Sequence, residues 1–300
     1  MTGPVASSSH ARYPVAQKER LLSADRGVSV SGRLLFGWVC VAILSVGKAA
    51  TDDPIEGLVM ARHADDQPLV TFEQFGGAPA RVLAEHSPTR KVAVLELPAH
   101  WRWRPPPQRE HTWELFVLEG ELNWGGEPVR RYGHVHLPAA VAPPELTADV
   151  GARVLLFLDP PRDTDGAAVR HRPYDGRAWR PGVVAERDTG IRLPLEVLDL
   201  LWVESTGQRT WLLRAGPELV LPWERHETVE EGFILEGGYR LVECLPAGER
   251  ADDYRPGGYF HRPPGVIHGG PGSGSDDTVV MLLRTPTALT VEFVQGCSPD

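Results

Sequence analysis

The sequence predicts an all-β protein made of two tandem jelly-roll-like barrels. Three features lead to this prediction: abundant turn residues, short apolar segments between the turns, and an internal duplication. The 300 residues include 31 glycines and 28 prolines, which is too many for a helical bundle. These turn residues separate short segments rich in Val, Leu, Phe and Trp. Short strands joined by tight turns are typical of an antiparallel sandwich or barrel.

Composition also limits the classes of function. The chain is 42% hydrophobic and carries 40 acidic against 31 basic side chains, a formal net charge of −9. A protein that binds nucleic acid through its phosphates has a basic excess, so we expect no nucleic-acid partner. No P-loop, HExxH or GxSxG pattern occurs, so nucleotide-binding, zincin and hydrolase functions have no sequence support.

The cysteines predict no covalent framework. Cys40, Cys244 and Cys297 are odd in number and far apart in the sequence. We therefore expect no disulfide framework and no cysteine metal site. Any metal ion would have to be held by histidine and carboxylate side chains.

Residues 1–69 are expected to be disordered apart from an apolar segment at 34–49. Its apolar run is shorter than the roughly 20 residues that span a membrane, and it suits the hydrophobic part of a signal peptide. Three interpretations of this segment are retained: a leader with a long polar region, upstream sequence included by a wrongly chosen start codon, or a buried N-terminal helix. The protein is exported if the segment is a signal peptide and cytoplasmic otherwise.

An internal repeat defines the domains. Residues 113–120 resemble residues 230–237, which lie 117 residues downstream, and each copy continues into a later Gly-X-X-His-X-Pro-type segment and an apolar strand. Two copies of one β unit are the simplest explanation. We predict a first domain over 70–160, a polar linker over 161–190 and a second domain over 191–300.

The second copy contains residues at the spacing of two known motifs, and through them it resembles the cupin superfamily. The matching residues are His226-(X)3-Glu230-(X)6-Gly237 and Gly257-(X)5-Pro263-X-Gly265-(X)2-His268. The duplication makes residues 70–295 resemble a bicupin. The resemblance implies a barrel that holds a divalent metal ion with histidine and glutamate side chains.

The ligand chemistry agrees with this resemblance. Residues two apart on a strand face the same way, so Glu224 and His226 can both point into the barrel. Imidazole nitrogens with a carboxylate suit Fe(II), and also Mn, Ni, Co or Zn, and leave coordination positions open. The expected ligands are His226, Glu230 and His268, with Glu231 replacing Glu230 if the register shifts. Glu224 is a further ligand, a group supporting the ligands, or a general base.

The sequence departs from the family at two points. Glu224 stands where the first histidine of the motif is usual, and the glycine-rich run 269–272 replaces the usual asparagine. His261, seven residues before His268, is expected to face into the barrel as a fourth donor or an acid/base. Glu224 and His261 are therefore the predicted catalytic residues. The counterpart of His261 in the first copy, His136, is retained although the ligands are not, which favours a structural or substrate role for His261 over ligation.

The first copy lacks these ligands. Its aligned positions are Pro107, Arg109, Trp113 and Pro143. A shift by one residue brings in His111 and Glu114 but no histidine at the second motif. We expect a metal-free first barrel whose interior is filled by tryptophans, with an aromatic binding pocket as the alternative. These are Trp101, Trp103, Trp113 and Trp124.

The predicted function is that of a metal-dependent cupin enzyme. The main hypothesis is a non-haem Fe(II) oxygenase that acts on a diketone or phenolic metabolite. Arg262 and Tyr259 are candidates for binding an anionic substrate at the mouth of the pocket. A non-catalytic metal-binding or sensing module, and a metal-dependent isomerase or cyclase, are the alternatives. The expected partner is a small-molecule substrate, and a homodimer is a further possibility.

Overall fold

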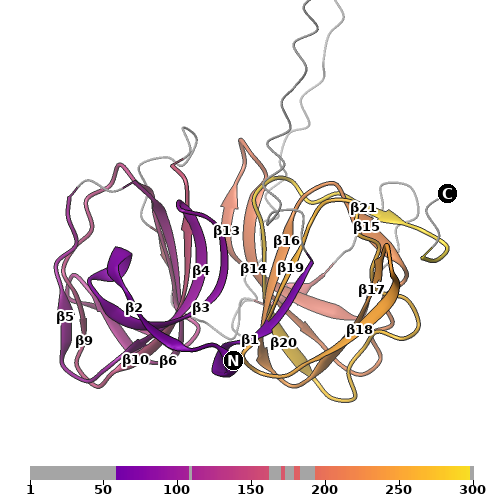
Figure 1. Ribbon diagram of the computed structural model, residues 1–300, viewed down its shortest axis with the longest axis horizontal. Helices are drawn as coiled ribbons and strands as arrows, with labels where there is room; N and C mark the ends of the chain where they lie inside the picture. The colour runs from indigo at the N-terminus through magenta and orange to yellow at the C-terminus, as the bar shows by residue number, and fades with distance from the viewer. Residues whose placement is uncertain (1–58, 108–109, 162–169, 173–178, 183–192, 298–300) are drawn as a thin grey trace, which may run out of the picture. The chain divides into compact units, whose positions relative to one another are not determined.

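The computed structural model describes residues 59–107, 110–161, 170–172, 179–182 and 193–297 (Figure 1). The predicted apolar segment at 34–49 lies outside the described residues. All the described residues belong to one compact unit. In the described part of the chain, no helix is long and apolar enough to cross a membrane.

The described residues are almost entirely strands, which confirms the all-β prediction. The first part of the chain contains β1 (Met60–His63), β2 (Leu69–Phe72), β3 (Ala78–Ser87), β4 (Arg90–Leu97), β5 (Trp101–Trp103), β6 (Thr112–Trp124), β7 (Glu127–Arg130), β8 (His134–Leu137), β9 (Leu146–Ala148), β10 (Ala152–Asp159), β11 (Arg170–Arg172) and β12 (Arg180–Pro181). The second part contains β13 (Leu195–Val203), β14 (Gln208–Ala215), β15 (Glu224–His226), β16 (Glu230–Glu236), β17 (Tyr239–Leu245), β18 (Gly248–Tyr254), β19 (Gly258–Arg262), β20 (Val279–Thr285) and β21 (Val291–Phe293). Two short 3-10 helices, η1 (Ala64–Asp66) and η2 (Glu73–Phe75), follow β1 and β2.

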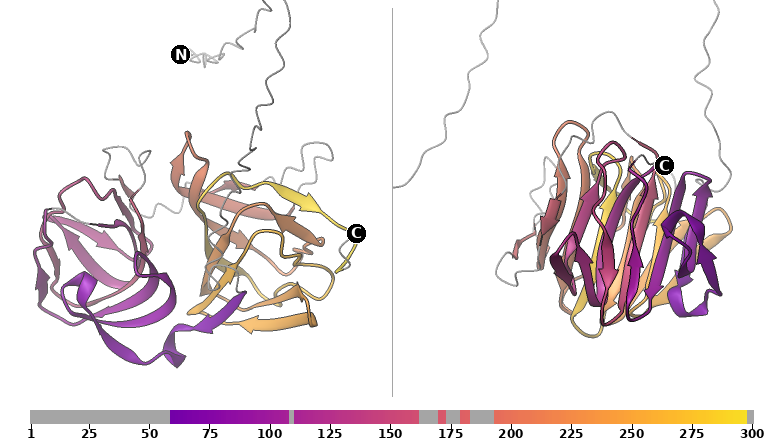
Figure 2. Two further views of the ribbon diagram at one scale, coloured as in Figure 1. Left: turned by 45° about the horizontal axis from the view of Figure 1, so that its top comes forward. Right: turned by 90° about the vertical axis from the view of Figure 1, so that its left-hand side faces the viewer.

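Each copy of the repeat forms its own curled sheet (Figures 1 and 2). In the first barrel the strand order is β11-β8-β6-β10-β4-β3-β2, with β5, β7 and β9 attached at one side. In the second barrel it is β1-β19-β16-β20-β14-β13-β12, and two small sheets, β15-β21 and β17-β18, complete the layer opposite. The same order recurs in both, which confirms the tandem arrangement.

The sheet pairing corrects the predicted boundaries. β1 pairs with β19, with Met60 opposite His261, so the expected disorder is wrong for residues 60–69. This N-terminal strand completes the sheet of the second barrel (Figure 1). The predicted linker is also structured in part, because β11 pairs with β8 of the first barrel and β12 pairs with β13 of the second. The pairing of β1 with β19 thus ties the N-terminal end of the described chain to the second barrel.

Three apolar clusters follow from strand alternation. One fills the first barrel and one lines the second, while the third lies between the two main sheets and includes Phe116, Phe157, Leu212 and Phe233. The predicted aromatic filling of the first barrel is confirmed. The rings of Trp101, Trp103 and Trp113 surround Phe75 with centroids 4.7 to 5.9 Å from its own, and Trp124 joins the same core.

The expectation that the cysteines form no disulfide is wrong. Cys244 and Cys297 are joined by a disulfide with their Cα atoms 5.3 Å apart. A separation of 53 residues does not prevent pairing, because the fold brings the end of β17 next to the C-terminal segment. The spacing argument considered sequence distance, whereas a disulfide needs only spatial proximity of the two Cβ atoms.

Candidate metal centre

Strand pairing brings the candidate ligands together in the second barrel. Glu224 and His226 occupy alternate positions of β15, so both side chains face the interior. Glu224 exchanges two backbone hydrogen bonds of 2.9 Å with His268, which places the second histidine directly beside β15. The side chains of Glu224, His226 and His268 are all buried. Two segments more than 40 residues apart therefore meet at one point.

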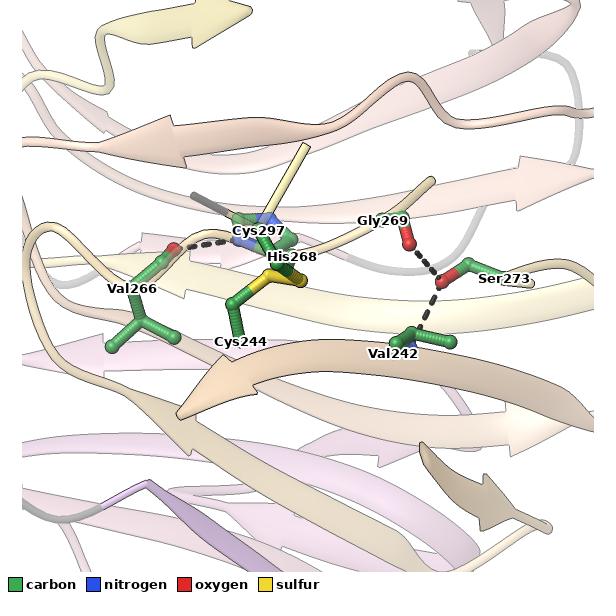
Figure 3. The surroundings of a disulfide bond; sticks show 7 residues. All are labelled: Val242, Cys244, Val266, His268, Gly269, Ser273 and Cys297. Carbon is green, nitrogen blue, oxygen red and sulfur yellow. Dashed lines mark hydrogen bonds between the residues drawn. A yellow bond between two sulfur atoms is a disulfide. The ribbon is translucent and has the colours of Figure 1, made fainter. Parts of the chain in front are cut away.

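Backbone carbonyls orient both imidazoles. Nδ1 of His226 lies 3.1 Å from the carbonyl oxygen of Thr290. Nδ1 of His268 lies 3.0 Å from the carbonyl oxygen of Val266, a contact that Figure 3 shows. A carbonyl accepts a hydrogen bond, so Nδ1 carries the proton and Nε2 keeps its lone pair. In each ring Nε2 then points toward the carboxylates. Metal-binding histidines commonly have this arrangement.

The ligand atoms are close enough to share one ion. Nε2 of His268 lies 3.4 Å and Nε2 of His226 lies 3.9 Å from Oε1 of Glu224. One ligand atom from each of these three residues lies within 4.8 Å of the other two. Within the described residues, Nε2 of His226 and Oε2 of Glu224 are buried without a hydrogen-bond partner. Unsatisfied lone pairs converging on one point fit a divalent cation.

Glu230 lies beside this cluster but is held by an arginine. Its Oε2 is 3.6 Å from Nε2 of His226 and accepts a hydrogen bond from Arg262. Arg262 in turn donates over 3.3 Å to Glu243, which also accepts from Arg250 at 2.7 Å. The geometry therefore leaves Glu224 as the carboxylate available to a metal ion, whereas Glu230 is in a buried ion pair. Sequence reasoning weighted these two carboxylates the other way.

The two carboxylates, Glu224 and Glu230, also differ in pKa. Burial, reinforced by the charge of Glu230, raises the pKa of Glu224 to about 7. Burial alone would also raise the pKa of Glu230, but the Arg262 guanidinium reverses this and holds the pKa below its usual value. Burial, together with the charge of Arg262, lowers the pKa of His268 well below its usual value. Glu230 is thus ionised and His268 is neutral, as a metal ligand requires.

A cavity of about 510 Å³ opens onto the cluster. Its walls are mainly apolar and aromatic, which is usual for a small-molecule site. The wall residues include Trp211, Leu213, Phe260, Met281, Leu283 and Val291. Three arginines also line it, and each is paired with a carboxylate: Arg180 and Arg209 with Asp199, and Arg262 with Glu230.

His261 does not face this cavity. On β19, Phe260 and Arg262 point inward, so His261 and Tyr259 point to the opposite face of the sheet. The prediction that His261 faces into the barrel is therefore not met. Tyr259 donates a 2.8 Å hydrogen bond to Glu231 instead of lining the mouth.

His261 belongs to a second group of potential ligands, with His86 and Glu231, that lies between the two barrels. The His86 and His261 rings are 4.2 Å apart, and Nε2 of His86 lies 3.5 Å from Glu231. Glu231 also contacts Arg284 at 3.1 Å and Arg90 at 3.5 Å. Two guanidinium groups already balance this carboxylate, so the group is better suited to an internal polar network than to a cation.

Two features of the centre were not found from sequence. Glu243 holds Arg262, and the carbonyl of Thr290 orients His226. A backbone carbonyl has no residue signature, so Thr290 gave no signal. Glu243 had one: it is the single carboxylate in the otherwise apolar run of residues 241–245.

Comparisons with known proteins support the fold. No family model matches the chain, and no curated protein does. Among solved structures, a protein from Nostoc punctiforme provisionally named a dioxygenase is 15% identical, with a TM-score of 0.59 over 80% of this chain and 88% of that one. Bacillus subtilis oxalate decarboxylase is 12% identical, with a TM-score of 0.52 over 78% and 79%. The Escherichia coli protein Ylba is 13% identical, with a TM-score of 0.56 over 77% and 91%.

These likenesses define the class of fold. The chain has the cupin fold in its two-barrel form, as the sequence motifs predicted. At identities this low the likeness extends to the architecture alone, so chemistry must be argued from the site. The second barrel contains a histidine and glutamate cluster able to hold a divalent metal ion.

Proposed function

We propose that this protein is a metal-dependent enzyme, a non-haem iron oxygenase acting on a small, largely apolar molecule of the diketone or phenolic type. The observation that carries the proposal is the cluster of Glu224, His226 and His268 at the wall of an apolar cavity. Three ligands on one side leave coordination positions open toward the cavity. The solved structure named provisionally as a dioxygenase supports this choice by analogy of fold.

His226, His268 and Glu224 would hold the metal ion. Bound there, a divalent metal supplies Lewis acidity toward a substrate oxygen and, as Fe(II), electrons for dioxygen. The chain's own contribution is to position the metal ligands and the substrate and to exclude water. Two carbonyls hold the imidazoles, and the wall of Trp211, Phe260 and Leu283 keeps the substrate's apolar body dry.

Glu230 is the carboxylate left to accept the substrate's proton. Its pairing with Arg262 keeps it ionised, and it lies 3.6 Å from His226. Such a carboxylate is a weak base, so it serves only a substrate whose hydroxyl is made acidic, as that of an enol or a phenol would be if its oxygen bound the metal ion.

The paired arginines argue against a dicarboxylate substrate. Each described arginine that lines the cavity already contacts a carboxylate. A second substrate carboxylate would enter an apolar cavity without a counter-ion, at a high desolvation cost. We therefore do not transfer to this chain the substrate named for oxalate decarboxylase.

The first test measures metal and oxygen together. Purified protein reconstituted anaerobically with Fe(II) should hold about one ion per chain and consume oxygen with members of a diketone and phenol panel. The His226→Ala/His268→Ala double variant should lose both properties. His100→Asn, a substitution at an exposed histidine outside the cluster, serves as the matched control and should retain both.

Testing the same diketone and phenol panel under argon distinguishes the oxygenase from an isomerase or cyclase and from a non-catalytic metal site. Product formed without oxygen would replace the oxygenase proposal by isomerisation or cyclisation. If no substrate turns over and chelation lowers only the melting temperature, the centre is a structural or sensing site. If unaltered protein and the double variant hold the same amount of metal, the metal centre itself is rejected.

A further inference from the structure

The C-terminal segment, residues 290–297, runs along the strand that carries two of the ligands. β21 pairs with β15, with Phe293 opposite Glu224 and Val291 opposite His226. Val294 extends this pairing by donating to the carbonyl of Trp223 over 2.9 Å. The segment therefore fixes the backbone of both ligands from the side opposite His268.

The same segment also fixes a ligand side chain. The carbonyl of Thr290 accepts the hydrogen bond from Nδ1 of His226 at 3.1 Å. Val291, the next residue, forms part of the cavity wall. Displacement of this segment would free the His226 ring to rotate and would open the cavity at the same time.

The far end of the segment is covalently attached beside the other histidine. Cys297 is bonded to Cys244 on β17. The backbone N–H of Cys244 donates to Ile267 over 2.8 Å, and the neighbouring Glu243 forms a bridge with His268. Figure 3 shows the disulfide together with His268 and its Val266 partner. The disulfide thus links the segment behind His226 to the strand behind His268.

Apart from this bond, the segment is held by its short pairing with β15, by the hydrogen bonds of Thr290 and Val294, and by a partly exposed ion pair between Arg225 and Glu292. β21 has only three residues, and none is fully buried. Two-stranded pairing of this length is marginal in water, and chain ends fray unless attached. The disulfide restrains the end of the segment three residues beyond Val294, so the pairing behind His226 depends on it.

We propose that residues 290–297, closed by the Cys244–Cys297 disulfide, act as a positioning clamp for His226 and Glu224, so that the metal centre is fully formed only in the oxidised protein. The proposal rests on the metal centre proposed above. Reduction by a dithiol breaks the S–S bond with two electrons and two protons, which yields two protein thiols and the dithiol's own disulfide. The released segment then frays, and the metal ion binds less tightly.

Metal binding to the full chain tests the clamp. Co(II) and Zn(II) affinities are measured by competition with a chelator, and the visible spectrum of bound Co(II) reports ligand geometry. We expect Cys244→Ser/Cys297→Ser to bind both ions 10- to 100-fold more weakly, about the loss that follows removal of a group supporting a metal ligand. The Co(II) spectrum should change, and dithiothreitol should do the same to unaltered protein, with reoxidation restoring it.

Two control variants separate this effect from general destabilisation. Cys40→Ser also removes a thiol, yet it should leave affinity and spectrum unchanged. Leu122→Ala creates a cavity in the core of the first barrel, so it should lower the melting temperature without altering metal affinity.

The clamp is rejected if the double serine variant binds Co(II) with unchanged affinity and spectrum. That result would leave the metal centre intact. Failure of unaltered, oxidised protein to bind either ion would instead reject the metal centre on which the clamp depends.

Discussion

At the scale of single residues, a carboxylate's neighbours decide whether it is available to a metal ion. Glu224 and Glu230 are both buried within 4 Å of His226. Only Glu230 has an arginine partner, Arg262. The sequence motif aligns Glu230 with the family's ligand, but the available lone pairs belong to Glu224.

Exchange of each carboxylate for its amide should separate these roles. Glu224→Gln should weaken Co(II) binding at least about 100-fold, since a ligand contributes more than the groups that support it. Glu230→Gln should retain the metal but lose about 3 kcal/mol of unfolding free energy, because Arg262 loses a buried partner. Chelator competition and urea unfolding measure the two effects. The reverse pattern would identify Glu230 as the ligand.

Metal binding should also depend on the protonation of Glu224. Its pKa of about 7 in the metal-free protein means that the carboxyl must release a proton to ligate at lower pH. Below pH 7 this residue should reduce metal affinity by about tenfold per pH unit. Affinity titrations between pH 5.5 and 8 test this. Glu224→Gln should lose this contribution, whereas His100→Asn should retain it.

At the scale of elements, alternation along a strand assigns neighbouring residues to different roles. On β16, Glu230 faces the cavity and Glu231 faces the other barrel, and on β19 Arg262 and His261 divide in the same way. The two histidines of the second motif region, His261 and His268, therefore belong to different sites.

His261→Ala should leave the metal centre unchanged. Because His261 lies in the layer between barrels, its removal should lower the unfolding free energy by about 1–3 kcal/mol, the usual cost of disturbing a buried polar contact. Co(II) stoichiometry and spectrum should match those of unaltered protein. A loss of Co(II) binding in a variant that melts normally would show instead that His261 reaches the metal.

At the scale of the whole molecule, a buried charged layer joins the two barrels. Arg284 of the second barrel contacts Asp159 and Glu114 of the first, as well as Glu231 of its own barrel. Glu114 further accepts hydrogen bonds from Thr210 at 2.7 Å and Gln208 at 3.0 Å. Removing one member would leave an uncompensated charge between the sheets, so this layer makes the barrels interdependent.

This layer should make the protein sensitive to acid. Burial lowers the pKa of His134 below its usual 6.5. Below pH 6.5 the unfolded chain therefore binds a proton at His134 that the folded chain does not, and the folded state becomes less stable. Burial raises the pKa of Glu114, but Arg284 and hydrogen bonds from His134 and His136 bring it well below 4.5. Its stabilisation is complete above pH 4.5 and is lost as the pH falls toward the lowered value.

The contribution of this layer to the unfolding free energy should therefore decline from about pH 6.5 and fall more steeply below 4.5. Urea unfolding measured between pH 8 and 3.5 checks this profile. Glu114→Gln should be less stable than unaltered protein at pH 7 and show a shallower acid limb. Glu224, whose pKa is raised to about 7, has the opposite effect between pH 7 and 4.5, so the role of His134 is tested in the Glu224→Gln background. A profile that is flat down to pH 4.5 in that background would contradict it.

We further propose that the protein is exported, because disulfides such as Cys244–Cys297 persist in oxidising compartments. The leader-like apolar segment at 34–49 supports the same conclusion from sequence. N-terminal sequencing of protein recovered from a cell envelope fraction should find a start near residue 50. Recovery of the full chain from the cytosol, with reduced cysteines, would oppose export.

The sequence by itself predicted the class of fold, and it also picked out the two histidines of the candidate metal centre. Strand character, turn spacing and the duplication are local properties, so they predicted two β barrels. His226 and His268 were identifiable because motif spacing reflects how far the chain travels between neighbouring strands. The aromatic filling of the first barrel was also predictable, since inward positions were occupied by Trp101, Trp103 and Trp113.

Only the tertiary structure decided which groups share a partner. Whether Glu224 or Glu230 is available depends on Arg262, and the direction of His261 depends on the register of β19 against β16. The pairing of β1 with β19 and the Cys244–Cys297 bond each join segments more than 50 residues apart. Such long-range contacts arise from the packing of the whole chain, which neither composition nor motif spacing records.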